Sequence, residues 1–99
     1  MSPNIAIDRV ELAAFCRRHG IGRLAVFGSA LRADFAPGSD IDVLVEFETG
    51  RTPGLAFFAM QDELTRMFGR AVDLHTPASL SRYFRDAVLA EAQDQYVAA

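Results

Sequence analysis

Apolar side chains recur along the 99-residue chain with two different spacings. Residues 8–19 and 55–68 place them three and four positions apart, which is the spacing of an amphipathic helix. Short apolar runs at residues 23–27, 41–47 and 71–75 have the length of buried strands, and the second of these is rich in β-branched residues. The pattern therefore predicts two long helices and three strands.

Polar residues and glycines mark the ends of these elements. Asp8 is a candidate N-cap of the first helix, Glu11 is its candidate partner in a capping box, and Gly20 is expected to stop the helix. Gly28 and Ser29 end the first strand in a sharp turn, after which we expect a short helix.

The C-terminal part of the chain is expected to be helical. Thr76 and Pro77 break the third strand, and the residues from there to Tyr96 predict one or two helices. The resulting order of elements predicts an α/β (α+β) domain with a small mixed β-sheet flanked by helices. A chain of 99 residues is expected to form a single domain, residues 1–99, without a separate substrate-binding domain.

The charges exclude several classes of function. Hydrophobic residues make up 51% and charged residues 23% of the chain, as in an ordinary globular protein. All ten positive charges are arginines, and the net charge of −3 argues against direct binding of nucleic acid. The absence of lysine excludes a Walker A phosphate loop. No apolar run approaches the length of a membrane span, so we expect a cytoplasmic protein.

Three aspartates on predicted strands are the strongest chemical signal. Asp40 and Asp42 lie two positions apart, so their side chains share one strand face about 7 Å apart. Asp73 lies in another apolar run, and strand pairing could bring it beside the first two. Such carboxylates can hold two divalent ions for displacement at phosphorus. On this spacing alone, an Asp-x-Asp after a turn is more often a solvated strand entry with a capping aspartate.

The turn at Gly28 and Ser29 favours the functional interpretation. Glycine lets the backbone approach an anion, and the serine hydroxyl and the following amides can hold phosphate oxygens. If the first two strands pair, this turn and the aspartates lie at the same edge of the sheet.

At these positions the sequence resembles a known family. Phe27-Gly28-Ser29, ten further residues and Asp40-Ile41-Asp42 are similar to the GS-x10-DxD signature of the DNA polymerase β-like nucleotidyltransferase superfamily. The longer string FGSALRADFAPGSDIDVLVEF resembles the minimal nucleotidyltransferases, the MntA type, and RAVDLHTPASL resembles their third-aspartate strand. The resemblance implies a fold like the polymerase β palm.

The resemblance also implies roles for individual residues. Gly28 and Ser29 would bind the triphosphate, and Asp40 and Asp42 would ligate magnesium, with two ions expected. Asp73 would be the third carboxylate, a metal ligand that helps to deprotonate the attacking hydroxyl.

Three further positions have more than one possible role. Arg32 matches an arginine that is usual after the GS pair, where it could neutralise phosphate charge or form a structural pair with Asp34. Ala33 stands where many relatives have glycine, which could reorient the loop. His75 shares a strand face with Asp73, so it is either a partner of the site or a partly exposed histidine without a role.

The function implied by the resemblance is transfer of AMP from ATP to a tyrosine of a HEPN-domain toxin, for which the chain would be the antitoxin. Two alternatives stay open: neutralisation of the toxin by binding alone, and transfer to a small molecule of the antibiotic type. The short chain weakens the last, because nothing encloses a sugar substrate. The sequence leaves open a homodimer or an assembly with the toxin.

Overall fold

The computed structural model describes residues 8–28, 40–51, 53–83 and 85–98. Its helices are α1 (Arg9–His19), α2 (Ala56–Phe68) and α3 (Arg85–Glu91), with a short 3-10 helix η2 (Pro77–Ser79). Its strands are β1 (Ile21–Phe27), β2 (Ile41–Phe47), β3 (Val72–His75) and β4 (Gln93–Val97). The expected short helix after Ser29 falls outside the described residues.

The four strands form one mixed sheet in the order β3-β2-β1-β4. Strand β1 pairs antiparallel with β2 on one side and with β4 on the other, whereas β2 and β3 are parallel. This arrangement confirms the predicted small mixed sheet with helices around it.

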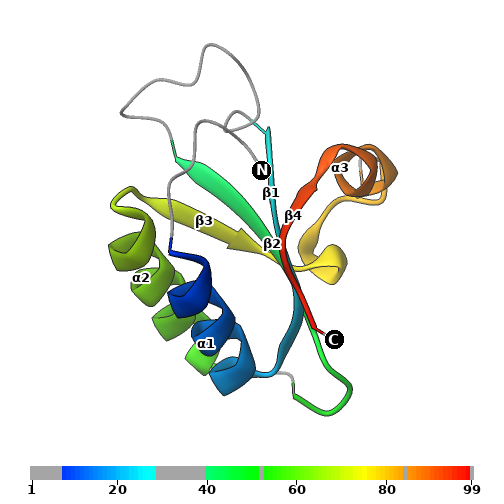
Figure 1. Ribbon diagram of the computed structural model, residues 1–99. Helices are drawn as coiled ribbons and strands as arrows, with labels where there is room; N and C mark the ends of the chain where they lie inside the picture. The colour runs from blue at the N-terminus through cyan, green and yellow to red at the C-terminus, as the bar shows by residue number, and fades with distance from the viewer. Residues whose placement is uncertain (1–7, 29–39, 52, 84, 99) are drawn as a thin grey trace.

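The two faces of the sheet are covered by different helices (Figure 1). Helices α1 and α2 pack on one face, and α3 lies on the other. The alternation along β2 explains the division, because Ile41, Val43 and Val45 belong to the larger core, whereas Leu44 belongs to the smaller cluster under α3. Most of the apolar core therefore lies on the α1–α2 face.

The predicted cap residues Asp8 and Gly20 are confirmed at the two ends of α1, whereas the reciprocal bond from the Glu11 side chain is not seen among the described residues. The Asp8 carboxylate accepts hydrogen bonds from the amides of Val10 and Glu11, and Gly20 takes the left-handed conformation at φ 70° that ends α1. Gly69 ends α2 in the same way. None of the helices in the described ranges has the length and apolar character needed to cross a bilayer.

The prediction of helix up to Tyr96 is wrong. Helix α3 ends at Glu91, and the chain then returns as β4 along the outer side of β1. The sequence pattern did not indicate this strand, because most of its residues are polar. Its buried residue is Gln95. Its conformation depends on pairing with a strand about seventy positions earlier and on Arg9, whose guanidinium donates to the Gln95 carbonyl at 2.7 Å.

Candidate active site

Strand pairing brings two of the three predicted aspartates side by side. In the parallel β2–β3 pair, Asp42 is the register partner of Asp73. Their apolar neighbours Ile41, Val43 and Val72 are buried in the main core, so both carboxylates project from the opposite face of the sheet. The sequence expectation that a neighbouring strand supplies Asp73 agrees with this register.

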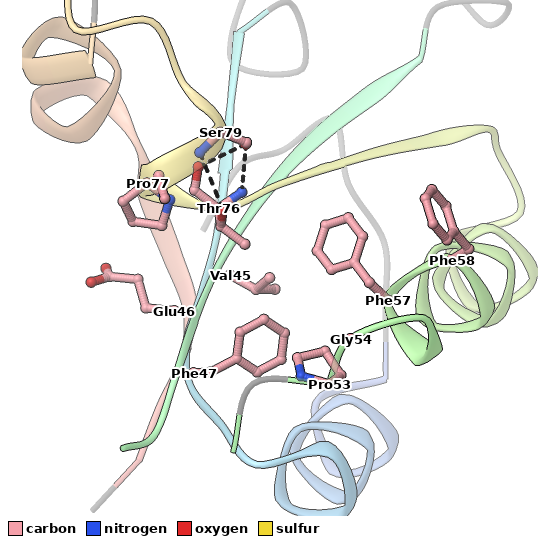
Figure 2. A pocket seen from close by; sticks show the side chains of 11 residues that line it. Val45, Glu46, Phe47, Pro53, Gly54, Phe57, Phe58, Thr76, Pro77 and Ser79 are labelled. Carbon is pink, nitrogen blue, oxygen red and sulfur yellow. Dashed lines mark hydrogen bonds between the residues drawn. The ribbon is translucent and has the colours of Figure 1, made fainter. Parts of the chain in front are cut away.

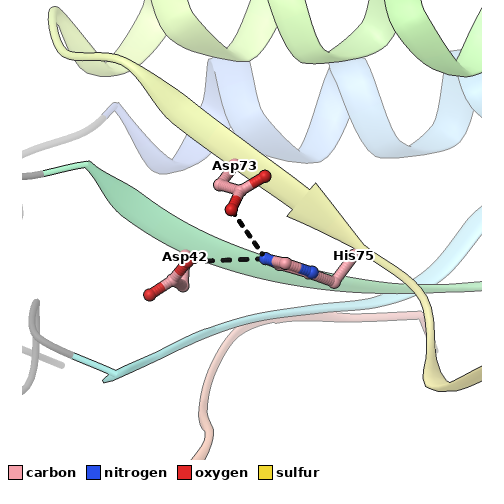
Figure 3. A group of neighbouring side chains, drawn as sticks. All are labelled: Asp42, Asp73 and His75. Atoms are coloured by element: carbon pink, nitrogen blue, oxygen red, sulfur yellow. Dashed lines mark hydrogen bonds and ion pairs between the residues drawn. The ribbon is translucent and has the colours of Figure 1, made fainter. Parts of the chain in front are cut away.

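His75 completes a compact group with these aspartates (Figure 3). Its Nε2 lies 3.4 Å from Asp42 Oδ1 and 3.3 Å from Asp73 Oδ2. One ligand atom from each of the three residues lies within 4.8 Å of the other two. The sequence placed His75 on the Asp73 face but left its role open.

Asp40 stands apart from this group. It is exposed, immediately before β2, and is not among the three residues whose ligand atoms lie within 4.8 Å of one another. Its charge nevertheless acts on Asp42. Burial raises the pKa of Asp42, the hydrogen bond from His75 opposes the rise, and the charges of Asp73 and Asp40 add to it. A cation placed here would relieve this repulsion.

The glycine turn lies directly against Asp42. Phe27 is the register partner of Asp42 in the β1–β2 pair, and Gly28 follows it with φ at 73°. A Cβ atom added to Gly28 would lie 2.6 Å from Asp42 Oδ2, so a side chain here would strain the backbone and displace the Asp42 carboxylate. The expected meeting of turn and aspartate at one sheet edge is confirmed. Ser29 and Arg32 lie outside the described residues.

The structure adds a carboxylate, that of Glu91, which no pattern in the sequence indicated. The Gly28 amide, a candidate phosphate ligand, donates a hydrogen bond to Glu91 Oε1 at 3.1 Å. Glu91 is the last residue of α3 and reaches the turn only because the chain folds back over the sheet. An anionic phosphate oxygen at this amide would take the place of an anionic carboxylate oxygen.

Helix α2 fixes the strand that carries Asp73. The amides of Val72 and Leu74 donate to Thr65 Oγ1 at 3.1 Å and to Gln61 Oε1 at 3.0 Å. Strand β3 lies at the edge of the sheet, and these bonds satisfy the amides that point away from β2. Asp73 lies between the two anchored residues, so its backbone is held in place on both sides.

A separate pocket of about 620 Å³ lies at the other end of β2 (Figure 2). Its walls are mainly apolar and come from the end of β2, the start of α2 and η2, including Phe47, Phe57, Phe58 and Pro77. Apolar walls suit a triphosphate poorly, because buried phosphate charge needs cations or hydrogen-bond donors. The aspartate group is therefore the better candidate for nucleotide chemistry.

The side chains of the group suit a divalent cation. Two carboxylates and an imidazole are common ligands of such ions, and they converge beside a glycine whose amide can face phosphate. The arrangement can hold a cation and a phosphate group next to each other on an open sheet face. These features are typical of proteins that act on phosphate groups with the help of a metal ion.

Comparison with known proteins gives the family. The model of the nucleotidyltransferase domain family matches residues 11–95, and the chain belongs to this family. The chain is 38% identical over 91 residues to the Methanocaldococcus jannaschii protein MJ0435, to which protein adenylyltransferase activity is ascribed, covering 92% of this chain and 97% of that protein. It is 36% identical to the protein adenylyltransferase MntA of Thermococcus cleftensis, over 75% of this chain and 74% of that protein.

Solved structures agree with this assignment. A structure assigned to the minimal nucleotidyltransferases is 38% identical and superposes with a TM-score of 0.71, covering 86% of both chains. A chain of the complex between the tri-AMPylated HEPN toxin of Shewanella oneidensis and an MNT antitoxin has a TM-score of 0.63. It is 18% identical, with coverage of 90% of this chain and 69% of that one, and shows a shared fold. The predicted fold and the predicted class, a nucleotidyltransferase enzyme, are confirmed.

Proposed function

We propose that this nucleotidyltransferase transfers AMP from ATP to a tyrosine hydroxyl of a HEPN-domain toxin and is the antitoxin of that toxin. The catalytic and metal-binding residues are Asp40, Asp42 and Asp73, and the nucleotide-binding residues are Gly28, Ser29 and Arg32. Magnesium is the expected ion. The acceptor and the toxin partner come from the family resemblance and from what the related proteins are named for.

One observation carries the proposal. Asp42 has Asp73 as its register partner on one side and the Gly28 turn on the other, where its Oδ2 would lie 2.6 Å from a Cβ atom added to Gly28. A metal site and a phosphate-binding turn are thus adjacent, which is what transfer at a nucleotide phosphate requires. Residues from β1, β2 and β3 meet at this point, and the apolar core beneath them keeps their spacing fixed.

The chain's own residues have separable tasks in the reaction. The acceptor hydroxyl attacks the α-phosphorus of ATP in line, the bond to the bridging oxygen breaks, and pyrophosphate leaves. Asp73, whose side chain is 57% exposed, is placed to take the hydroxyl proton, and Gly28 offers its amide to the leaving phosphates. Divalent metal held by the carboxylates supplies charge neutralisation at the phosphates.

A protein acceptor suits the shape of the site. Asp73 is exposed, and no second domain exists among the described residues to enclose a small molecule. The chain's net charge of −3 complements a partner with a basic RNA-binding surface. Both features favour a protruding protein segment over an antibiotic-like substrate.

Intact-mass spectrometry tests the proposal. A HEPN-domain toxin incubated with this protein, ATP and magnesium is expected to gain one or more AMP masses on a tyrosine and to lose RNA cleavage. The Asp42→Asn variant is expected to add none, because the amide keeps the shape of the side chain and loses the charge that holds metal. The Asp62→Asn variant, which changes an exposed acid on α2, is the matched control and should transfer normally.

Silencing of the toxin by both wild type and Asp42→Asn, with no added mass, would instead support neutralisation by contact alone. Modification of an aminoglycoside-type alcohol in place of the toxin would support the small-molecule alternative.

A further inference from the structure

His75 lies between the two carboxylates of the acidic group. Its Nε2 lies at nearly equal distances from Asp42 Oδ1 and Asp73 Oδ2, 3.4 Å and 3.3 Å. One ring nitrogen of His75 and one carboxylate oxygen each of Asp42 and Asp73 all lie within 4.8 Å of one another. A single imidazole nitrogen therefore faces both carboxylates at once (Figure 3).

These spacings are compatible with neighbouring ligands of a single metal ion. Hydrogen bonds between a nitrogen and an oxygen are normally about 2.7 to 3.2 Å long, and shorter when charged. Metal–ligand bonds of about 2.0 to 2.2 Å place adjacent ligand atoms about 2.9 to 3.5 Å apart in octahedral or tetrahedral geometry. Both distances from His75 Nε2 fall in the second range.

The ring is held in this orientation by its surroundings. The Phe27 ring packs against the imidazole with centroids 5.3 Å apart, and the His75 side chain is only 24% exposed. The preceding residue, Leu74, is anchored to Gln61 of α2 through its amide. An ion entering the group would meet a nitrogen that is already in place, so little side-chain entropy is lost.

We propose that His75 is a nitrogen ligand of the Asp42–Asp73 metal site. The inference rests on the proposed function, because it adds a nitrogen ligand to the metal that Asp42 and Asp73 would hold. Imidazole nitrogen favours first-row transition ions, whereas magnesium prefers oxygen ligands. The site of this chain binds magnesium, but with the imidazole beside the carboxylates of Asp42 and Asp73 it favours ions such as Co²⁺ and Zn²⁺ over magnesium more strongly than a site of carboxylates alone.

The chain offers a matched control, because it has two histidines. The other one, His19, is the last residue of α1 and lies 3.3 Å from Glu63, on the α1–α2 side of the sheet. Wild type, His75→Gln, His19→Gln and Asp42→Asn are compared by calorimetry with Co²⁺ and with Mg²⁺. NMR of ¹⁵N-histidine-labelled wild type is recorded with and without Zn²⁺, and this readout is independent of any variant's folding.

We expect His75→Gln to lower Co²⁺ affinity at least about tenfold, since even outer-shell partners contribute that much. The same variant should change Mg²⁺ affinity less than about threefold, and His19→Gln should change neither affinity. The ¹⁵N signal of His75 Nε2 should move to the position of a metal-bound nitrogen on addition of Zn²⁺, with the His19 signals unmoved.

Two results would overturn the inference in distinguishable ways. If Asp42→Asn loses both ions while His75→Gln behaves like His19→Gln and the His75 ¹⁵N signals stay in place, the metal site stands and the nitrogen ligand is wrong. If wild type binds neither Co²⁺ nor Mg²⁺, both this inference and the metal site of the proposed function are wrong.

Discussion

The two faces of the sheet use the same strands for opposite purposes. On the α1–α2 face, Leu24, Val43, Leu64 and their neighbours form a closed apolar core. On the α3 face the apolar cluster is small, consisting of Phe27, Leu44, Leu80 and Val88, and part of the remaining strand surface presents Asp42, Asp73 and His75.

The difference shows how a small chain can hold repelling carboxylates together. Asp42 alternates with Ile41 and Val43, each at most 1% exposed, so hydrophobic burial on one face fixes the position of charge on the other. Stability and chemistry are thus placed on opposite sides of one backbone. Substitutions on the two faces should therefore have effects of different kinds.

Truncation in the main core should give the largest change in stability. Leu64→Ala removes a fully buried side chain and is expected to lower the free energy of unfolding by about 3 kcal/mol, through lost burial and the cavity left behind. Leu89→Ala truncates a partly buried side chain of α3 and should lower the free energy of unfolding by less than about 1.5 kcal/mol. Urea unfolding measures both, and equal losses would remove the contrast between the faces.

Substitution of the turn glycine should combine strain with loss of the site. Gly28→Ala forces alanine into a left-handed conformation, which costs about 1 to 2 kcal/mol, and pushes its Cβ against Asp42 Oδ2. Gly69→Ala is the matched control, because Gly69 has the same sign of φ and no atom within 4 Å of the added Cβ. Thermal unfolding should show similar losses in both variants, whereas calorimetry should show weaker metal binding in Gly28→Ala alone.

Removal of the carboxylate at the turn should strengthen nucleotide binding. Glu91→Ala frees the Gly28 amide and deletes a negative charge beside the expected phosphates, so affinity for magnesium–ATP should rise about three- to tenfold. Asp86→Ala removes an exposed acid from the same helix and should leave the affinity unchanged. A fall in affinity for Glu91→Ala would mean that this carboxylate assists binding.

The smallest effect concerns the charge of Asp42 in metal-free protein. Its folded pKa is raised above the ordinary value of 3.8, mainly by burial, so the protonated form favours folding. The stabilisation that this protonated carboxyl contributes is fully present below pH 3.8 and is lost as the pH rises through the folded pKa. Near neutral pH in chelator, Asp42→Asn should therefore be more stable than wild type by up to about 1 kcal/mol, a gain that disappears toward pH about 3.5. Urea titrations across this range check the sign.

Features set by neighbouring residues were predictable from the sequence. Asp8 and Gly20 mark the ends of α1 through contacts within one turn, and the alternation in β2 assigns Asp42 to the face opposite the core. Strand β4 was missed because it is polar and short, and its pairing with β1 joins distant parts of the chain. Pairings of this kind leave no local periodicity to detect.

The candidate site likewise has features that could be predicted from the sequence and features that could not. Asp42 and Asp73 could be proposed from their strands, and pairing of those strands then brought them together. The contact of Glu91 with Gly28 depends on where α3 crosses the sheet, and the approach of His75 to both carboxylates depends on the exact register of β3. Residue spacing places His75 on the Asp73 face, but it gives neither the contact of His75 with Asp42 nor the contact of Glu91 with Gly28.

Calorimetric titration of the protein with ATP, with magnesium and with chelator, tests the central claim most directly. The open sheet face carries acids and lacks lysine, so nucleotide should bind with magnesium and at least about tenfold more weakly without it. Asp42→Asn should bind weakly in both conditions. Equal affinity of wild type with magnesium and with chelator would contradict the account, because the carboxylates of Asp42 and Asp73 would then not hold the metal through which the triphosphate is bound.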